Sequence, residues 1–589
     1  MRHPFRCPLR VHRSLRRLAC LALAGLCTLS AAVASSQPTT DLQGDPSASA
    51  APAAPAAPAA PAAMPRDASA AEPVREPIPV PPAADHVDLL LPQVRGRGAA
   101  LAERTPHGEG WDTNGELRLR GERMPRFGLD QSGHASDRGQ WLQSRVVAGG
   151  RWRALPSLSV DLEIEAANGW LGGDRSALGT AYTERPFLQA RDGSGDLARV
   201  LPRKAMVTWT SGIGQVLVGA QTFQWGTGML AADGAQAPDF GDAWQGNIVA
   251  RAAFATRPLA GSGLAPLWRD LSVFVGADWV IRDDNASMYD GDEAAAALLG
   301  VRAGDDALKL GLLLAARDQT DREDPWRPDR RRAHTRVLAT DAWARWQGDM
   351  GSVRLGLEGE VAYIAGTTTR PYSDETATDG ASVRQLGAVA RLRVDHDATA
   401  TTWKLEAGYA SGDNDVRDAT ARQFAMHSDH NVGLVLFDQV LPAVQARSID
   451  RLADPKLMSV RPPSGRFAVN AGGQVANAMY LHPVLRWRPS LPLDVRLGYV
   501  LAMAAADIAD PYQTAIHGGF ATTAGGQVQG GRVYGHEVDV RATWDFTLPQ
   551  RVTLRAGGEG GLLVPGSALS GVAGLGTPWM ARGLMSLLW

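Results

Sequence analysis

Cysteine is almost absent from this chain of 589 residues. The only cysteines, Cys7, Cys20 and Cys27, all lie within the first 34 residues. If that segment is cleaved during export, the remaining chain has no thiol, which excludes disulfides, a cysteine nucleophile and a thiolate metal site. Backbone pairing and side-chain packing must then hold the exported chain together.

Long apolar runs are absent after residue 34, so no transmembrane helix is predicted there. The one long run, residues 18–33, follows an arginine-rich start and leads into Ala32-Val33-Ala34, the small-residue pattern of a cleavage site. This arrangement predicts a signal peptide over residues 1–34. A single membrane anchor is the alternative, but the run is short for one. No lipobox is present, so we expect no lipid on the exported chain.

The first part of residues 35–112 is poor in bulky apolar side chains. Alanine and proline repeat over residues 51–61, and further prolines follow over residues 77–82. Such a segment cannot bury enough apolar surface to order itself, and it favours extended polyproline-like conformers. We predict a disordered, Ala/Pro-rich periplasmic linker over residues 35–112. A tether to the cell wall or to a periplasmic partner is the alternative, which the few charges there do not support.

Charge of one sign is not in excess either. The formal net charge is −2, and without a basic cluster no nucleic-acid partner is expected. Lysine is rare, and nearly all of the positive charge is arginine. Codon bias is the simpler explanation of the preference for arginine over lysine. The alternative explanation is that arginine has a chemical role on the surface of the lumen.

The dominant pattern of the chain is an alternation of apolar and polar side chains. From residue 113 onward apolar side chains alternate with polar or charged ones, most clearly over residues 158–165, 353–363 and 537–546. A period of two with one apolar and one charged face is typical of the strands of an outer-membrane β-barrel. Short and long links alternate between these segments, as turns at one end and loops at the other would. We predict an all-β, transmembrane antiparallel up-and-down barrel of about 18 strands (16–18) over residues 113–589.

Tryptophans fall at one end of the predicted strands. Six tryptophans end predicted strands that run in the same direction, each on the apolar face: Trp152, Trp209, Trp346, Trp487, Trp544 and Trp589. An indole is stable at the level of lipid headgroups, so a girdle of this kind marks a membrane interface. A soluble sandwich has its tryptophans inside without regard to strand direction, and the girdle therefore favours the barrel.

The last stretch, Trp579–Trp589, alternates in the same way and ends the chain on an aromatic side chain. Chain ends are usually polar and frayed. The stretch resembles the closing strand of outer-membrane barrels, whose terminal aromatic residue is read by the barrel assembly machinery. We therefore expect Trp589 to be an assembly signal and the strand to pair with the one at residue 113. The expected partners are the assembly machinery, outer-membrane lipid and lipopolysaccharide.

The charged face of the predicted strands would line the lumen of the barrel. We expect these side chains in particular to line a pore: Arg118, Arg120, Arg145, Arg151, Asp161, Glu163, Arg251, Arg345, Glu358, Glu360, Arg391, Arg393, Glu537, Asp539, Arg541 and Arg555. Two interpretations stay open. Neighbouring strands pair these charges across a wet interior, or an excess of arginine favours anionic solutes in a hydrated pore. A barrel of this size leaves an aqueous channel.

Two of the predicted long loops are expected to narrow that channel. Residues 224–243 contain glycines that permit tight turns and aspartates that cap them. The longest loop, residues 412–476, contains the apolar run of residues 432–441. An apolar run of this length is poorly placed in water. We predict that it folds back over or into the pore as a lid or constriction.

Other kinds of site are also considered. Two acidic loops offer hard oxygen ligands for Ca²⁺ without following an EF-hand pattern, and solvated loops are the simpler interpretation; the residues are Asp413, Asp415 and Asp418, and Asp290, Asp292 and Glu293. No cofactor is expected. The histidines are dispersed and no Gly-x-Ser-x-Gly motif accompanies them, so catalysis is not expected; they include His427, His430, His482, His517 and His536.

Four short motifs carry a resemblance to a family. They are Gly408-Tyr409-Ala410-Ser411-Gly412-Asp413, Gly433-Leu434-Val435-Leu436-Phe437, Trp225-Gly226-Thr227-Gly228 and Asp239-Phe240-Gly241-Asp242. With them the chain resembles porin-like outer-membrane β-barrel proteins of myxobacteria and related bacteria over residues 113–589. It is more distantly similar to alginate-export-type porins, which have an arginine-lined lumen and loops that cover the pore. The resemblance implies the fold, and no substrate contact is carried over from it.

These features together predict a protein of the outer membrane of a Gram-negative bacterium. The first functional hypothesis is a porin-like channel for the passive passage of small polar solutes, with anionic solutes and saccharides among them. The second is a non-conducting surface protein that displays loops for adhesion or assembly. An outer-membrane enzyme is the third and the least supported, because no catalytic set of residues is visible.

Overall fold

The structure, a computed structural model, describes residues 110–179, 200–243, 246–260, 262–323, 332–370, 380–452, 473–490, 492–549 and 552–589. The predicted signal peptide and all but the last residues of the predicted linker lie outside the described residues.

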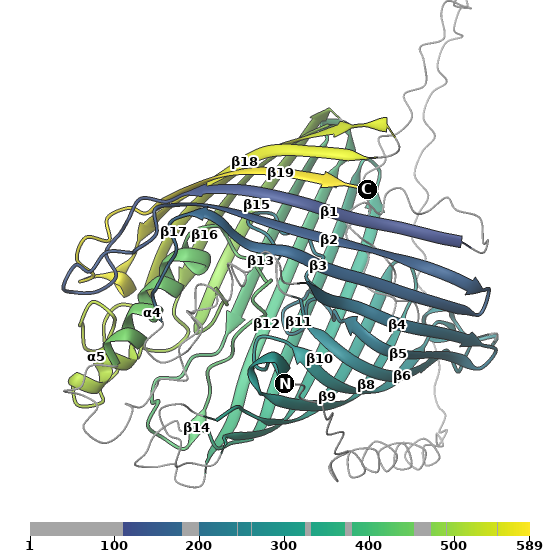
Figure 1. The fold of residues 1–589 in the computed structure, drawn as a ribbon, viewed down its shortest axis with the longest axis horizontal. Helices are drawn as coiled ribbons and strands as arrows, with labels where there is room; N and C mark the ends of the chain where they lie inside the picture. Colours follow the sequence, from purple (N-terminus) through teal and green to yellow (C-terminus); the bar gives the residue numbers. More distant parts are fainter. Residues whose placement is uncertain are drawn as a thin grey trace, which may run out of the picture. The chain divides into compact units, whose positions relative to one another are not determined.

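The described residues form one sheet that closes on itself (Figure 1). Its strands are β1 (Gly110–Arg123), β2 (Gln140–Leu155), β3 (Leu158–Gly173), β4 (Leu201–Ser211), β5 (Gly214–Thr222), β6 (Ile248–Thr256), β7 (Ser272–Arg282), β8 (Glu293–Gly304), β9 (Leu308–Thr320), β10 (His334–Met350), β11 (Val353–Thr368), β12 (Ala381–His396), β13 (Thr401–Ala410), β14 (Thr420–Ala421), β15 (Ala478–Ser490), β16 (Leu493–Met503), β17 (Val533–Thr547), β18 (Thr553–Pro565) and β19 (Trp579–Leu588). Of these 19 strands, β14 has only two residues, belongs to a loop and pairs in parallel with β12. The other 18 strands make up the wall. The predicted 18-stranded antiparallel barrel is confirmed.

The ring closes between the first strand and the last. β1 pairs with β2 on one side and with β19 on the other, and both pairings are antiparallel. In the closing pair Leu117 lies opposite Leu587 and Gly121 opposite Gly583. Because the wall has no free edge, its backbone N–H and C=O groups find partners in neighbouring strands all the way round.

The links between strands alternate in length, as predicted. At the turn end they have two to five residues, except for the link of residues 257–271, which contains the single turn α3 (Pro266–Arg269). β1 begins and β19 ends at the turn end. At the loop end they are long, and two of them contain α4 (Leu441–Leu452) and α5 (Pro511–Ile516). The described helices are all too short or too polar to cross a bilayer. β1 begins at Gly110, three residues before the predicted start of the barrel.

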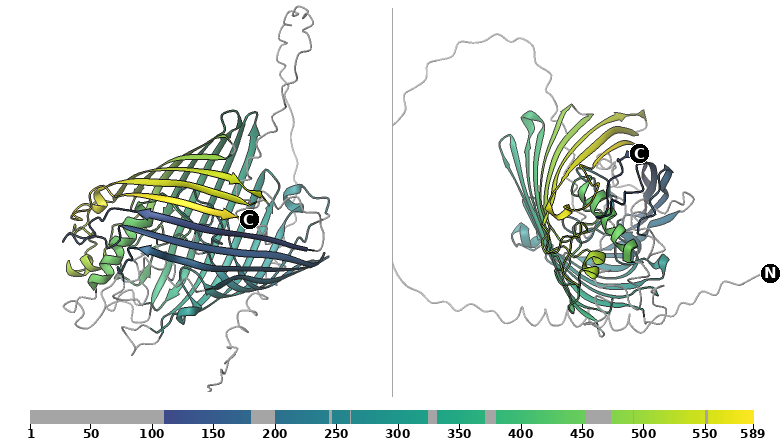
Figure 2. Two further views of the ribbon diagram at one scale, coloured as in Figure 1. Left: turned by 45° about the horizontal axis from the view of Figure 1, so that its top comes forward. Right: turned by 90° about the vertical axis from the view of Figure 1, so that its left-hand side faces the viewer.

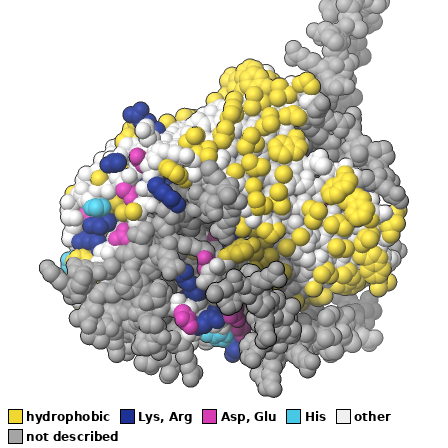
Figure 3. All heavy atoms as spheres, in the orientation of Figure 1, with side chains coloured by type: hydrophobic (Ala, Val, Ile, Leu, Met, Phe, Trp, Pro, Cys, Tyr) yellow, Lys and Arg dark blue, Asp and Glu magenta, His cyan; other side chains and the backbone are white. Residues whose placement is uncertain are grey.

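The two faces of the wall differ in chemistry. Along β1, Leu117 is 37% exposed whereas Arg118 is 1% exposed, and along β3 the same contrast holds between Leu162 and Glu163. Successive side chains of a strand point to opposite faces, so the apolar side chains lie outside and the charged ones line the lumen. Hydrophobic side chains cover much of the strands, and charged ones gather toward the loop end (Figure 3). This arrangement suits a wall surrounded by lipid.

The predicted tryptophan girdle is present. All six of its members are between 38% and 51% exposed on the outer face, and they lie toward the turn end of their strands: Trp152, Trp209, Trp346, Trp487, Trp544 and Trp589. The largest apolar core, by contrast, lies inside the barrel, where residues 432–452 contribute 12 of its 38 buried side chains. The view onto the loop end shows the green helical segment of α4 within the ring of strands (Figure 2).

Candidate functional site

The lumen wall contains the side chains that the sequence places there. The buried ones are Arg118, Arg120, Arg145, Asp161, Glu163, Arg251, Glu360, Glu537 and Asp539. The partly exposed ones are Arg151, Arg345, Glu358, Arg391, Arg393, Arg541 and Arg555. Some pair with an opposite charge on the adjacent strand, as Arg145 does with Glu165 at 2.6 Å. Cross-strand pairing, the first of the two interpretations of these charges, therefore holds for part of the set.

Inner loop A, the link of residues 223–247 between β5 and β6, crosses the lumen and is described except at residues 244–245. Near its start, the indole Nε1 of Trp225 donates to Oδ1 of Asp341 on β10 at 3.0 Å. Near its end, the Asp242 carboxylate lies 3.1 Å from the guanidinium of Arg118 on β1. Half of the ring separates β1 from β10. The loop therefore reaches from one side of the barrel to the other.

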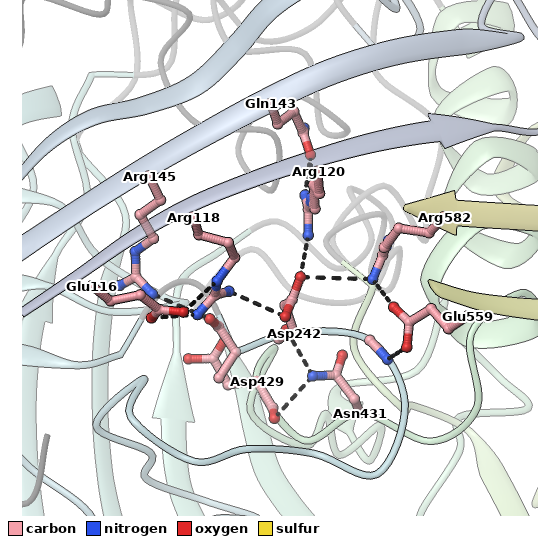
Figure 4. Close-up of polar contacts among 12 residues, drawn as sticks. Glu116, Arg118, Arg120, Gln143, Arg145, Asp242, Asp429, Asn431, Glu559 and Arg582 are labelled. Carbon is pink, nitrogen blue, oxygen red and sulfur yellow. Dashed lines mark hydrogen bonds and ion pairs between the residues drawn. The ribbon is translucent and has the colours of Figure 1, made fainter. Parts of the chain in front are cut away.

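Asp242 joins inner loop A to the closing pair of strands (Figure 4). Its carboxylate lies 3.0 Å from Nη1 of Arg120 and 3.7 Å from Nη1 of Arg582. Arg582 also contacts Glu559 at 2.7 Å, and none of these side chains is more than 7% exposed. Removing one member of a buried cluster of charges leaves the others uncompensated. Arginines of β1 and β19 thus fix the loop beside the seam of the barrel.

A second anchor lies on the opposite wall at Gly226. The carboxylate of Glu360 on β11 accepts a hydrogen bond from the backbone N–H of Thr227. Nη1 of Arg391 on β12 donates to the carbonyl oxygen of Thr227 at 3.2 Å. Gly226 has a φ of +53°, and a Cβ atom there would collide with the Glu360 carboxylate. The glycine is required both by the backbone conformation and by the close approach of the wall.

A third anchor of inner loop A is Asp239. Its carboxylate lies 2.8 Å from Nζ of Lys404 and 3.2 Å from Nη1 of Arg496. Burial alone would raise the pKa of Asp239, but the two cations outweigh it and hold that pKa well below its ordinary value. Asp239 therefore stays ionised, and this anchor persists over the whole range of pH in which the barrel would work.

Inner loop B, residues 411–477, enters the lumen from the loop end; its residues 411–452 and 473–477 are described. The carboxylate of Glu537 on β17 accepts hydrogen bonds from the N–H groups of Val435 and Leu436, both at 2.7 Å. The apolar run of residues 432–441 is largely buried inside the barrel. The prediction that this run folds into the barrel is confirmed.

Aromatic side chains of the wall hold the tip of inner loop B. The ring of Phe437 packs edge-on against Tyr480 and Tyr534, with ring centroids 6.2 Å and 6.4 Å away. The hydroxyl of Tyr480 donates to Oε1 of Glu406 at 2.6 Å and lies 2.9 Å from Nε2 of His430. The tip is therefore fixed by packing and by polar contacts at once.

The two inner loops also bind each other. The backbone N–H of His427 donates to the carbonyl oxygen of Met229 at 2.7 Å. Nδ2 of Asn431 donates to the carbonyl oxygen of Asp242 at 2.9 Å (Figure 4). These contacts make inner loops A and B one layer across the lumen, so moving either loop disturbs the other.

Helix α4 secures inner loop B at the loop end. Nε of Arg447 lies 2.9 Å from Oδ2 of Asp130, in the link between β1 and β2. Burial raises the pKa of Asp130, but hydrogen bonds from Ser132, Arg447 and the His134 backbone outweigh it and lower the pKa to about 2. The guanidinium of Arg451 lies over the ring of Tyr512 on α5, 3.7 Å from its centroid.

The contact between α4 and α5 should weaken as pH rises. Oδ1 of Asp510 accepts hydrogen bonds from Oγ of Ser448 and the N–H of Gln513, both at 2.9 Å. Burial raises the pKa of Asp510 from 3.8 to about 6. A carboxyl with a raised pKa stabilises the folded state fully below its ordinary value, and that stabilisation is lost as pH rises through about 6.

Hydrogen exchange measures this effect once the intrinsic pH dependence of exchange is corrected for. We expect protection of residues 511–516 to be lower at pH 7.5 than at pH 4.5 by on the order of tenfold. The variant Asp510→Asn should have nearly equal protection at the two values. A pH dependence that persists in the variant would show that another group is responsible.

Cations stand opposite one another on the lumen wall toward the turn end. Arg486 on β15 is in register with Arg496 on β16, and Arg496 with Arg541 on β17. On the strands beside them Arg393 lies opposite Lys404. We call these five residues the cationic row; their side chains are between 10% and 29% exposed. Like charges directly opposite destabilise a sheet. Two carboxylates of the wall offset part of this repulsion: Asp395 pairs with Arg393, and Asp494 pairs with both Arg486 and Arg496.

The alternative sites considered from the sequence are not assembled. Asp413 accepts a hydrogen bond from the N–H of Arg422, and Asp418 lies 2.7 Å from its guanidinium. Within the described ranges no group of three or more His, Cys, Asp or Glu side chains is placed to hold a metal ion. The histidines are spread over the lumen, the end of α5 and the outer wall: His427, His430 and His482 inside, His517 after α5, and His536 outside.

Arg203 is a lumen contact that the sequence reasoning missed. Strict alternation places Arg203 and Lys204 on opposite faces. Both nevertheless contact Glu163, Arg203 through Nε and Lys204 through Nζ, at 2.9 Å each. The register of β3 and β4 shifts between Glu163 and Ile164, and a bulge of this kind turns two successive side chains to one face. The adjacent Pro202 was the only signal available in the sequence.

The strand pairing and the loops together define the class of this protein: a closed β-barrel with an apolar outer face, a charged lumen and two loops that cross it. No family model matches the chain, and no curated protein matches it. The resemblance to myxobacterial barrel proteins accordingly stays a prediction.

Solved structures give distant likenesses. The chain is similar to OccK9 (OpdG) of Pseudomonas aeruginosa, with a TM-score of 0.43, 11% identity, and 81% of this chain and 99% of that chain covered. It is similar to OccAB1 of Acinetobacter baumannii, with a TM-score of 0.43, 10% identity and coverage of 81% and 96%. For OpdK of Pseudomonas aeruginosa with vanillate, the TM-score is 0.43, the identity 11% and the coverage 81% and 98%. Likenesses of this degree carry no functional argument.

Proposed function

We propose that this protein is a porin-like channel in the outer membrane of a Gram-negative bacterium, through which small polar solutes pass passively, anions in preference. The apolar outer face, the tryptophan girdle and the closed ring of backbone pairing support a membrane-spanning barrel. A wall of 18 strands is wide enough to surround an aqueous channel. The channel is then narrowed by inner loops A and B.

The cationic row is the observation that carries the preference for anions. Its side chains remain partly exposed in the lumen although they face one another. Asp239, Asp395 and Asp494 pair with four of the five members, so three carboxylates stand against five cations. Arg496 and Lys404 of the row also contact Asp239 of inner loop A. A solute that passes this loop therefore meets the row next. Rings of fixed cations lower the energy of anions in a pore.

A second candidate function, a non-conducting barrel that displays loops at the cell surface, is favoured by the density of contacts between the inner loops and the wall. Inner loop A alone is anchored to the wall at Trp225, Thr227, Asp239 and Asp242. A barrel filled in this way would be a rigid platform. The two candidates differ in whether ions cross the assembled protein.

Replacing Arg541 by glutamine should lower the preference for anions. The ion pair of Arg541 with Glu559 is long, at 3.7 Å, and Glu559 keeps a closer partner in Arg582 at 2.7 Å, so the change removes a lumen charge with little effect on the wall. A unit charge at roughly 7 Å in water is worth about 0.6 kcal/mol, which predicts a fall of about threefold in the chloride-to-potassium permeability ratio. The reversal potential across a planar bilayer under a salt gradient measures this ratio.

Arg532→Gln is the matched control, because Arg532 lies in the link of residues 504–532 at the loop end and pairs with Asp507. The control should keep the wild-type ratio, since solvent and salt screen a charge outside the pore. An unchanged ratio in Arg541→Gln, or an equal change in both variants, would contradict the assignment of selectivity to the cationic row.

A further inference from the structure

The outer wall is hollowed beside the seam of the barrel. A hollow of about 1060 Å³ extends over β16–β19 and β1–β3. The apolar side chains that line it, Leu142, Leu497 and Val540, are between 43% and 52% exposed. Charged residues that alternate with small residues of the lining, Glu559 after Gly558 and Arg582 before Gly583, are buried and face the lumen. The hollow therefore opens on the apolar, outer face of the barrel.

The floor of the hollow is a row of small residues that the strand register brings together. In order around the wall, the row is Val495, Ala542, Gly558, Gly583, Gly121, Leu142 and Gly172. The parallel row beside it contains Val540, Gly560, Ala581 and Arg123. In the middle of the first row no side chain is larger than a methyl group, so backbone forms the floor.

Bulky side chains form both banks of this floor. Toward the loop end the bank is the row Tyr499, Val538, Leu562 and Trp579. Toward the turn end it is the row Trp544, Ala556, Met585 and Leu119. On β17 the banks are six residues apart, from Val538 to Trp544, which is roughly 20 Å along the strand. We call the floor and banks together the seam trench.

Two glycines of the seam trench, Gly583 and Gly121, are not required by the protein itself, whereas a Cβ atom at Gly558 or Gly560 would lie 3.2 Å from a backbone carbonyl oxygen. Neither Gly583 nor Gly121 has a positive φ, so an alanine would be free of backbone strain at either position. A Cβ atom at Gly583 would meet nothing within 4 Å, and one at Gly121 would meet only Leu142 Cδ1, at 3.8 Å. Glycine weakens a strand interior. What the glycines preserve is therefore the space outside the wall.

Arg123 indicates what occupies that space. It is the last residue of β1, lies opposite Ala581 at the loop-end side of the trench, and is exposed on the outer face. In the part of the chain that the structure describes, its guanidinium makes no hydrogen bond or ion pair. Arginine on the lipid-facing side is costly in the bilayer core and tolerated at headgroup level. There its planar fork matches the oxygens of a phosphate.

We propose that the seam trench binds one lipopolysaccharide molecule, with acyl chains over Gly583 and Gly558 and a phosphate of the lipid A headgroup on Arg123. This inference rests on the proposed location in the outer membrane. Lipopolysaccharide is chosen because Arg123 lies at the loop end, and the long loops of outer-membrane barrels are on the extracellular side. The lipid of the outer leaflet there carries both phosphates and several acyl chains. The apolar banks and the cationic rim match these two parts of one molecule.

The experiment compares lipid retention by full-length variants. Wild-type protein, Gly583→Phe, Arg123→Ser and the control Gly359→Phe are purified from outer membranes in mild detergent and incubated with purified rough-type lipopolysaccharide or with phosphatidylethanolamine vesicles. Gly359 is a matched control because it lies on the outer face of β11, where a Cβ atom would meet only Val389 O at 3.8 Å. Native mass spectrometry counts the bound lipid and also the number of protein copies.

We expect wild type and Gly359→Phe to retain one lipopolysaccharide, and Gly583→Phe and Arg123→Ser to retain about tenfold less, as the loss of one charge-assisted contact or of the acyl site predicts. Equal retention by all four proteins would overturn the proposal, as would preference for phosphatidylethanolamine or a wild-type dimer that Gly583→Phe dissociates. Conductance is recorded in parallel. Retention without conductance would reject the proposed channel alone, and conductance without selective retention would reject the seam trench alone.

Discussion

Deleting residues 428–445 should raise the single-channel conductance by about threefold or more, because a wall of this size without internal loops leaves a wide aqueous channel. The deleted segment includes the apolar run that fills the lumen and the N–H groups that bind Glu537. It also includes Asn431, which holds inner loop A at Asp242. Both inner loops should therefore lose contacts. Planar-bilayer recording of the variant measures the change.

The control for this deletion replaces residues 518–530, which lie in the link that contains α5, by a short Gly-Ser segment. That variant should keep the wild-type conductance because the described hydrogen bond of this segment with inner loop B, from Nη1 of Arg417 to the carbonyl oxygen of Gly518, lies outside residues 428–445. Glu537→Gln is a second test that leaves the chain length unchanged. It replaces one of the two oxygens that accept from the Val435 and Leu436 N–H groups by an NH2 donor and should produce transitions to larger conductance levels. If neither the deletion of residues 428–445 nor Glu537→Gln changed the conductance, inner loop B would not be the constriction.

Replacing Trp589 by aspartate should lower the amount of assembled barrel by about tenfold or more. The change puts a charge at the end of the closing strand and removes an indole that contacts the membrane interface and covers the backbone of Gly115. The N–H and C=O groups of Trp589 pair with Gly115 on β1 at 3.2 Å and 3.0 Å. Its indole lies over Gly115, where a Cβ atom would collide with the ring. Heat-modifiable mobility of outer-membrane fractions measures the assembled amount.

Trp403→Asp is the control, because it shows how much assembled barrel is lost when any tryptophan of the membrane interface is replaced by aspartate. Trp403 lies on the outer face near the turn end of β13 and is 57% exposed, so its replacement costs a comparable interface contact. We expect a smaller loss than for Trp589→Asp, and in both variants the molecules that do assemble should conduct as wild type does. Equal losses would contradict a special role for the terminal residue.

Most of the architecture follows from local pattern. Alternation along residues such as 158–165 assigns each side chain to one face, and the lengths of the links fix the direction of each strand. The tryptophan girdle and the closure of the ring through Trp579–Trp589 were predictable for the same reason. These are properties of single strands and hairpins, so the single sequence is sufficient to predict them.

The contacts inside the lumen were predictable only in outline. The burial of residues 432–441 follows from their apolar character, but the acceptor for their N–H groups, Glu537, lies on a distant strand. Asp242 was taken for a turn-capping residue, whereas it contacts Arg118, Arg120 and Arg582. Which partners meet depends on register and on loop path around the whole ring. Neither the register nor the path of a loop produces a periodic pattern in the sequence.

Of the two interpretations of the charged face, cross-strand pairing holds for part of it, and a preference for anions stays a prediction for the cationic row. Arg145 with Glu165, and Arg251 with Asp278, form the cross-strand pairs expected of a wet interior. In the cationic row, Arg486, Arg496 and Arg541 stand in register without alternating acids between them. The sequence contained both sets, but only the register separates them.

Planar-bilayer recording of the refolded full-length protein tests the central claim, that the assembled barrel is a channel. The account predicts ohmic conductance with a chloride-to-potassium permeability ratio above one. Assembled, heat-modifiable barrels that insert into the bilayer and pass no current would contradict it and would leave the loop-displaying surface protein as the function of this fold.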